Sequence, residues 1–188
     1  IIAQGNVASY QDCCSIINKA IDAWGKIDIL VNNAGITKFP DTQNLSSLNI
    51  NAFNEIYSVN VGGAFQMCSV AEQMLKEAKG SIVNISSHSG ISGMGSSIAY
   101  AASKGALNTM TLGLARAFSP DVRVNAICPG FVDTDWMSKK LDQKELQKFK
   151  KKVSEISPLQ EIVSAEDVAE ATSWFALGGN LITGQLLV

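Results

Sequence analysis

Apolar residues recur along the chain with two alternating periods. Four segments place them at helical spacing, at residues 7–24, 48–79, 99–118 and 165–177. Between these segments lie short continuous apolar runs, at residues 27–31, 82–85 and 122–127, and a further run begins at 185–188. Continuous apolar runs are typical of strands that are buried on both faces of a parallel sheet. The alternation predicts an α/β fold in which right-handed crossovers build a doubly wound parallel sheet.

A lysine-rich stretch at residues 138–152 interrupts this alternation. Its apolar positions are Leu141, Leu146 and Phe149, which predicts one or two amphipathic helices. We interpret the lysines as a solvated face rather than as a binding patch. The rest of the sequence contains no repeat, low-complexity tract or clear second domain, so we expect residues 1–188 to form a single domain.

Composition narrows the possible functions. Hydrophobic residues make up 46% of the 188 residues and charged residues 17%, and the net charge is −2. This balance is typical of a buried sheet, and it gives no electrostatic reason to expect binding to nucleic acid or to an anionic membrane. No apolar run approaches the roughly 20 residues that a membrane-spanning helix needs. The sequence therefore predicts neither a nucleic-acid partner nor a membrane partner.

The cysteines give a prediction about environment. They are Cys13, Cys14, Cys68 and Cys128, and their spacing matches neither a zinc site nor a redox motif. We interpret Cys13, Cys14 and Cys68 as small buried hydrophobic residues of helices. The sequence thus predicts no metal site and a reducing, cytoplasmic location.

Tyr100 and Lys104 form the pair with the clearest chemistry. Four residues apart on a predicted helix, they lie one turn apart on the same face. An ammonium beside a phenol lowers the tyrosine pKa from about 10, so that the phenol can exchange a proton with an alcohol or carbonyl oxygen near neutral pH. Ser87 follows a predicted strand, at the sheet edge where α/β proteins bind ligands. The motif is short, and a surface Tyr and Lys on an amphipathic helix are the alternative.

Further motifs decide between these interpretations. They are Asp28-Ile-Leu-Val-Asn-Asn-Ala-Gly35, Val59-Asn60-Val61, Asn84-Ile-Ser-Ser87, Arg123-Val-Asn-Ala-Ile-Cys-Pro-Gly-Phe-Val-Asp-Thr134, Ala165-Glu-Asp-Val-Ala169 and Ile182-Thr-Gly-Gln185. In order and approximate spacing they resemble the short-chain dehydrogenases/reductases, and most of all the bacterial branch that includes 3-oxoacyl-carrier-protein reductases. The resemblance implies a three-layer Rossmann-type fold and a lid-like helical insertion near residues 135–160, which Trp136 and Met137 open.

The chain departs from this family at its start. No T-G-x-x-x-G-x-G turn precedes Ile1, so we expect an incomplete polypeptide that lacks the family's first strands. The glycine-rich run at residues 90–95 lies between Ser87 and Tyr100, where the family has a loop on the substrate side. It also lacks the context of a strand that leads directly into a helix, so it does not predict a phosphate cradle.

The resemblance assigns catalytic roles to four residues. It implies that Tyr100 is the general acid or base, that Lys104 binds the nicotinamide ribose and lowers the Tyr100 pKa, and that Ser87 holds the substrate oxygen. It implies that Asn60 anchors a water that connects Lys104 to solvent. The thirteen-residue interval to Tyr100 favours Ser87 over Ser86. The only histidine, His88, is interpreted as a loop or pocket residue, because the family mechanism needs none.

The resemblance also implies a cofactor, NAD or NADP. Besides Tyr100 and Lys104, the residues expected to bind it are Asn6, Val7, Asn33, Ala34, Gly35, Pro129, Gly130, Val132 and Thr134. Asn6 stands where the family commonly has Asp, which keeps an acceptor oxygen and removes the charge. Residues that choose between NAD and NADP lie outside this sequence.

Two functions follow as expectations. The first is an NAD(P)-dependent oxidoreductase that transfers hydride between the nicotinamide and a small, mostly apolar carbonyl/alcohol substrate, in a homodimer or homotetramer. The alternative is a truncated chain, deficient in cofactor binding, with a structural or oligomerisation role only. The complete set of Asn60, Ser87, Tyr100 and Lys104 favours the first.

Overall fold

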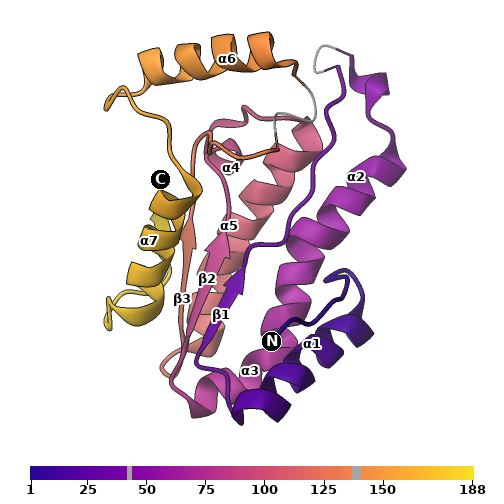
Figure 1. Ribbon diagram of the computed structural model, residues 1–188. Helices are drawn as coiled ribbons and strands as arrows, with labels where there is room; N and C mark the ends of the chain where they lie inside the picture. The colour runs from indigo at the N-terminus through magenta and orange to yellow at the C-terminus, as the bar shows by residue number, and fades with distance from the viewer. Residues whose placement is uncertain (42–43, 137–140) are drawn as a thin grey trace.

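A parallel sheet lies at the centre of the protein (Figure 1). The computed structural model describes residues 1–41, 44–136 and 141–188. Within them, four strands pair in the order in which they occur in the chain: β1 (Ile29–Asn32), β2 (Ser81–Ile85), β3 (Arg123–Ile127) and β4 (Leu186–Leu187). Every pairing is parallel. The predicted parallel α/β sheet is therefore confirmed, and its carboxyl ends form one edge.

Helices cover both faces of the sheet and make the three layers. On one face, α1 (Tyr10–Trp24), α3 (Ala64–Glu77) and α5 (Ile98–Phe118) share a hydrophobic core with Leu30, Ile82 and Val124 of the strands. On the other face, Phe175 of α7 (Ala165–Leu177) packs against Val83 and Ile127. Neighbouring residues of β2, Ile82 and Val83, thus face opposite cores, as expected for a strand covered on both sides.

The single long helix predicted over residues 48–79 is wrong in one respect. The segment consists of α2 (Ile50–Tyr57), a π-helical segment (Ser58–Gly63) and α3. A π-helical turn takes one more residue than an α-helical turn, and such turns are frequent at functional sites. Here the wider turn carries Asn60, whose side chain is buried and hydrogen-bonded. Apolar spacing could not show this, because the flanking helices keep a helical period.

Local polar residues set the ends of the other helices. The first helix starts at Tyr10 rather than at residue 7, because the Ser9 side chain accepts a hydrogen bond from the Asp12 backbone and caps it. It ends at Gly25, which adopts a left-handed conformation with φ of 72°. The Ser97 side chain caps α5 in the same manner by accepting from the Tyr100 backbone at 3.1 Å.

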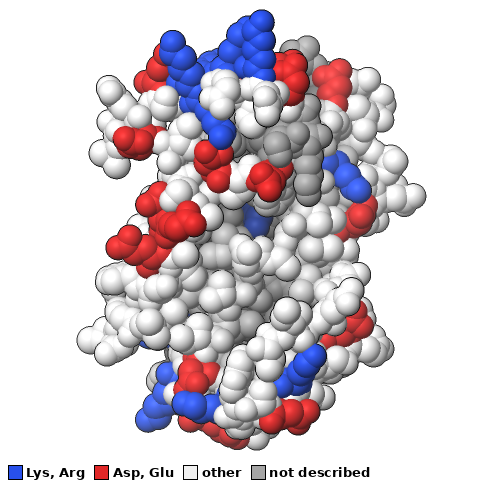
Figure 2. Space-filling model, in the orientation of Figure 1, with Lys and Arg blue, Asp and Glu red and all other residues white. Residues whose placement is uncertain are grey.

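The lysine-rich stretch forms α6 (Gln143–Ile156), which lies across the carboxyl end of the sheet (Figure 1). A capping box between Asp142 and Glu145 starts it later than the predicted residue 138. Phe149 packs edge-on against Phe131, with ring centroids 5.0 Å apart, and Lys150 forms an ion pair with Asp133 at 2.6 Å. Figure 2 shows lysines gathered at this end of the molecule. Met137, Lys139 and Lys140, named or included in the sequence predictions, lie outside the described residues.

Three shorter findings complete the fold. Two short helical pieces, η1 (Leu45–Ser47) and α4 (Ser89–Ser92), lie in the loops that follow β1 and β2. None of the helices in the described part of the chain is long and apolar enough to cross a membrane. The four cysteines are free, and Cys13, Cys68 and Cys128 are buried.

Candidate active site

The predicted catalytic residues meet at the carboxyl ends of β1 and β2. Ser87 follows β2 directly, and Tyr100 and Lys104 lie in the first two turns of α5. The Ser87 hydroxyl is near enough to the Tyr100 phenol to lower the pKa of that phenol. The Lys104 ammonium lies 5.7 Å from the centroid of the Tyr100 ring. The spacing of the sequence motifs therefore corresponds to a real cluster in space.

Lys104 is unusual because its charged group is buried. Only 3% of the residue is exposed, and its Nζ donates a 2.7 Å hydrogen bond to the Ile85 carbonyl at the end of β2. Burial lowers the pKa of Lys104 from its usual 10.5 to about 8. A Cβ atom placed on Gly35 would lie 3.7 Å from this Nζ. Lys104 thus lies beside Gly35 in the loop after β1.

The pKa of Tyr100 differs from the sequence prediction. We expected Lys104 to lower it, and in this structure it is raised from 10.0. Burial of the phenol is the larger cause, and the hydrogen bond from Ser87 opposes it. Lys104 does not reverse the shift, because its ammonium is directed at the Ile85 carbonyl. At neutral pH Tyr100 is a protonated phenol, which is the form that a proton donor needs.

Asn60 connects the loop after β1 to α5. Its Oδ1 accepts from the Ile36 backbone N–H at 2.8 Å, and its Nδ2 donates to the Ile36 carbonyl at 3.0 Å. The same Nδ2 donates to the Ser103 hydroxyl at 3.0 Å. The side chain is fully buried and satisfied by protein groups. These bonds place Asn60 beside Gly35, whose added Cβ would lie 3.4 Å from its Oδ1.

The two adjacent serines have different surroundings. The Ser86 hydroxyl donates to the Lys104 carbonyl at 3.2 Å, beneath the site. The Ser87 hydroxyl accepts from the Ser89 N–H at 3.1 Å, and its interaction with the Tyr100 phenol lowers the pKa of that phenol. The two serines therefore have different partners, and the catalytic role of Ser87 stays a prediction. His88 directly precedes α4, and its backbone N–H donates to the Pro129 carbonyl, which ties this loop to the loop after β3.

The residues expected to bind the cofactor fall into three places. Asn33, Ala34 and Gly35 follow β1 directly, and Pro129 and Gly130 follow β3, so both groups border the catalytic cluster. Val132 forms an isolated bridge with Val163, and Thr134 is exposed beyond it.

Asn6 and Val7 precede α1, and Val7 contacts α3. The Asn6 Oδ1 accepts from the Ala8 N–H at 3.0 Å, and the Val7 carbonyl accepts from Gln66 at 3.0 Å. The Asn6 side-chain oxygen, which was expected to serve as an acceptor for the cofactor, thus accepts a hydrogen bond within a local turn.

Sequence analysis missed part of the polar network behind the site. Asn32, Asn84 and Thr111 form a buried chain of hydrogen bonds from β1 through β2 to α5, each 2.9 Å long. The signal was present, because an Asn inside an apolar strand needs a buried partner. Trp136, which opens the expected lid-like insertion, lies edge-on to the Tyr100 ring with centroids 6.0 Å apart. The described residues contain no group of three or more His, Cys, Asp or Glu side chains arranged to hold a metal.

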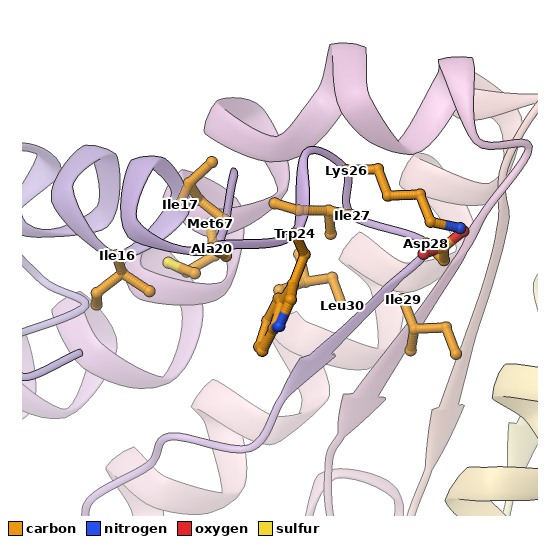
Figure 3. A pocket seen from close by; sticks show the side chains of 10 residues that line it. All are labelled: Ile16, Ile17, Ala20, Trp24, Lys26, Ile27, Asp28, Ile29, Leu30 and Met67. Atoms are coloured by element: carbon orange, nitrogen blue, oxygen red, sulfur yellow. The ribbon is translucent and has the colours of Figure 1, made fainter. Parts of the chain in front are cut away.

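One cavity lies away from these residues. It measures about 650 Å³ and is lined mainly by apolar residues of α1 and β1, among them Ile16, Trp24 and Leu30 (Figure 3). The Lys26–Asp28 ion pair at its rim marks the amino end of β1. Ligands of open parallel sheets bind at the opposite, carboxyl end, where Ser87 and Tyr100 lie. We therefore assign the cavity no part in the chemistry.

Comparison with known proteins agrees with this geometry. The sequence model of a family described as "Enoyl-(Acyl carrier protein) reductase" matches residues 1–188. The 3-oxoacyl-[acyl-carrier-protein] reductase FabG of Thermotoga maritima is 33% identical over 185 residues, which cover 97% of this chain and 72% of that protein. The chain belongs to the short-chain dehydrogenase/reductase family. As a member of this family it is an oxidoreductase that acts on CH–OH and C=O groups.

Solved structures of short-chain dehydrogenases/reductases extend the agreement to the fold. A protein of Burkholderia xenovorans described as belonging to this family has a TM-score of 0.90 and 35% identity, covering 100% of this chain and 73% of its own. ElxO with NADP bound has a TM-score of 0.87 and 33% identity, covering 98% of this chain and 74% of its own. The family's cofactor, and that of this member, is NAD or NADP.

The residues present fit the nicotinamide half of such a cofactor. Gly35 leaves a gap beside Lys104 and Asn60 that a Cβ would begin to fill. A Cβ on Gly130 would meet nothing within 4 Å, so the loop after β3 is also open. Lys104 supplies donors to this space, and the exposed Asn33 and Ala34 border it.

Proposed function

We propose that this protein is a reductase of 3-oxoacyl thioesters, with Tyr100 as the proton donor to the carbonyl oxygen. The observation that carries the proposal is the placement of Ser87, Tyr100 and the buried Lys104 together at the carboxyl edge of the sheet, with the Lys104 ammonium 5.7 Å from the centroid of the Tyr100 ring. The substrate class is taken from the resemblance to the 3-oxoacyl-[acyl-carrier-protein] reductase of T. maritima.

Two hydroxyl groups act on the carbonyl oxygen in this proposal. The Ser87 hydroxyl donates a hydrogen bond to it and stabilises the negative charge that develops there. The raised pKa of Tyr100 keeps the phenol protonated until the oxygen becomes basic enough to take its proton. When bound, the reduced nicotinamide cofactor supplies the hydride.

Two other residues keep the proton donor in place. Lys104 holds the ribose side of the cofactor, and its ammonium is fixed beside the phenol by the hydrogen bond to the Ile85 carbonyl. Asn60 fixes the loop at Ile36 relative to α5, and we assign it the water that connects Lys104 to solvent. The remaining cofactor contacts are those expected from Asn6, Val7, Asn33, Ala34, Gly35, Pro129, Gly130, Val132 and Thr134.

We also propose how the chain is organised and where it acts. Residues 1–188 form one dinucleotide-binding and catalytic domain, and the segment near 135–160 acts as its lid. Support for the lid comes from the contacts of α6 with the loop after β3 at Phe131 and Asp133. The protein is a cytoplasmic homodimer or homotetramer, for which the free cysteines and the family resemblance are the support.

The experiment that tests the proposal has two steps. The protein is titrated with NADH and with NADPH, following nicotinamide fluorescence. The protein and the preferred reduced coenzyme are then mixed with a 3-oxobutanoyl thioester of N-acetylcysteamine or with the corresponding 2-enoyl thioester. Oxidation of the coenzyme is recorded. We expect turnover of the 3-oxo compound. Turnover of the enoyl compound alone would overturn the substrate class. A folded protein that binds neither coenzyme would favour the alternative of a structural or oligomerisation role.

The choice of serine is tested in the same assay. Ser87→Ala removes the donor to the substrate oxygen, so we expect kcat to fall about 10²–10³-fold. Ser86→Ala removes only the bond to the Lys104 carbonyl, and we expect it to be mild. Equal losses in the two variants would contradict the assignment of Ser87.

A further inference from the structure

Ser103 is a fully buried hydroxyl at the junction of three segments of the site. Its Oγ accepts from the Asn60 Nδ2 at 3.0 Å and donates to the Tyr100 carbonyl at 2.8 Å. Asn60 in turn holds both backbone groups of Ile36. One hydroxyl therefore links the first turn of α5, the π-helical segment and the loop after β1.

We propose that Ser103 is a positioning residue, which sets the Tyr100 phenol against Ser87 by fixing the first turn of α5 to Asn60. This inference rests on the proposed role of Tyr100. Ser103 lies on the same helix, three residues after Tyr100, and is buried beneath it, so it acts through Tyr100 and Asn60 and does not touch the substrate.

The bonding of Ser103 does more than satisfy a buried polar group. A Ser hydroxyl inside a helix can satisfy its donor by forming a hydrogen bond with a backbone carbonyl of the preceding turn. Ser103 makes this bond and accepts a second one from Asn60, whose inward direction depends on the π-helical segment. Without the hydroxyl, Asn60 Nδ2 keeps only the Ile36 carbonyl, and the connection from the β1 loop to α5 is lost.

The same helix provides a matched control at Thr111. Its hydroxyl is also fully buried, accepts from the Nδ2 of an asparagine, Asn84, at 2.9 Å, and donates to a carbonyl of the preceding turn, Leu107, at 2.8 Å. Thr111 lies two turns further along α5, and its partner Asn84 belongs to the core of the sheet. A purely structural hydroxyl and a positioning hydroxyl can thus be compared in one helix with the same bonding pattern.

The test compares Ser103→Ala with Thr111→Val. Each variant loses one buried hydroxyl and its two hydrogen bonds, so we expect similar reductions in thermal stability. Only Ser103→Ala should lower kcat, by at least tenfold, with an unchanged dissociation constant for NADPH. Ser103→Thr keeps the hydroxyl and should restore most of the loss in kcat. An equal loss of kcat in Ser103→Ala and Thr111→Val would overturn the proposal.

A second readout works without turnover. The ionisation of Tyr100 is followed by ultraviolet absorbance of phenolate, as the difference between each protein and the same protein carrying Tyr100→Phe. The hydrogen bond from Ser87 lowers the Tyr100 pKa, so a displaced phenol should titrate at higher pH in Ser103→Ala and at an unchanged pH in Thr111→Val. An unchanged Tyr100 titration in Ser103→Ala would refute the positioning role. Absence of wild-type turnover together with a shifted titration would refute the proposed function alone.

Discussion

Gly90 lies where the backbones of α4 and α5 are in close contact. A Cβ at this position would be 2.5 Å from the Lys104 carbonyl carbon and 2.6 Å from the Gly105 nitrogen. Both are backbone atoms, so no side-chain rotation can relieve the clash. Gly90→Ala therefore forces the two helices apart by roughly 1 Å, because ordinary contacts lie near 3.5 Å.

The expected cost has two parts. Overpacking of this kind costs typically about 1–3 kcal/mol, which for a protein of this size lowers Tm by roughly 2–12 °C. The displacement also acts on the site, since the Gly90 N–H donates to the Ser87 carbonyl while the clash moves Lys104. A shift near 1 Å in a catalytic group can lower the rate on the order of 10²-fold.

Thermal denaturation followed by circular dichroism, together with the thioester reduction assay, measures both parts. Gly113→Ala is the matched control, because Gly113 lies inside α5 and a Cβ there meets nothing within 4 Å. We expect this variant to gain up to about 1 kcal/mol from helix propensity and to keep its activity. Wild-type stability and wild-type kcat in Gly90→Ala would refute the reasoning, because the backbone contact would then be absent in solution.

Two further predictions concern the acid–base groups. Tyr100→Phe keeps the ring contact with Trp136 and removes only the phenol hydroxyl, so Tm should change by only a few degrees. Because the proton donor is lost, kcat should fall about 10²–10⁴-fold. Retained turnover would contradict the role of Tyr100. Lys104 has a folded-state pKa of about 8 against its usual 10.5, so between these values the unfolded chain binds more protons and the free energy of unfolding should rise with pH. Urea titrations of the wild type and Lys104→Met at pH 7, 8, 9 and 10 should show the wild type gaining up to about 3 kcal/mol relative to the variant, and a pH-independent difference would argue against a buried, weakly basic Lys104.

Periodicity and motif spacing were sufficient for the sheet and for the cluster of Ser87, Tyr100 and Lys104. Strands buried on both faces leave continuous apolar runs, and carboxyl ends of parallel strands share an edge. The four-residue interval from Tyr100 to Lys104 fixes a common helix face wherever the helix lies. These relations depend on local geometry, which a sequence contains.

The parts that sequence could not predict depend on contacts between distant residues. The π-helical segment exists around Asn60, whose partners Ile36 and Ser103 lie 24 and 43 residues away. The raised pKa of Tyr100 follows from burial and from the direction of Lys104 towards Ile85, and neither can be read from the spacing of the pair. The lysine-rich run suggested a helix from residue 138, whereas α6 begins at Gln143, after the capping box that Asp142 forms with Glu145.

The π-helical segment at Ser58–Gly63 allows the site to change in evolution while the fold stays the same. Its i→i+5 turns hold one residue more than an α-helical turn would, while α2 and α3 continue as α-helices on either side. Loss of a single codon here would return the segment to an ordinary helix and remove the inward placement of Asn60. The apolar residues of α2 and α3 would need little rearrangement. The same fold can therefore lose the ability to hold the loop after β1 through the deletion of one residue in this segment, or gain it through the insertion of one.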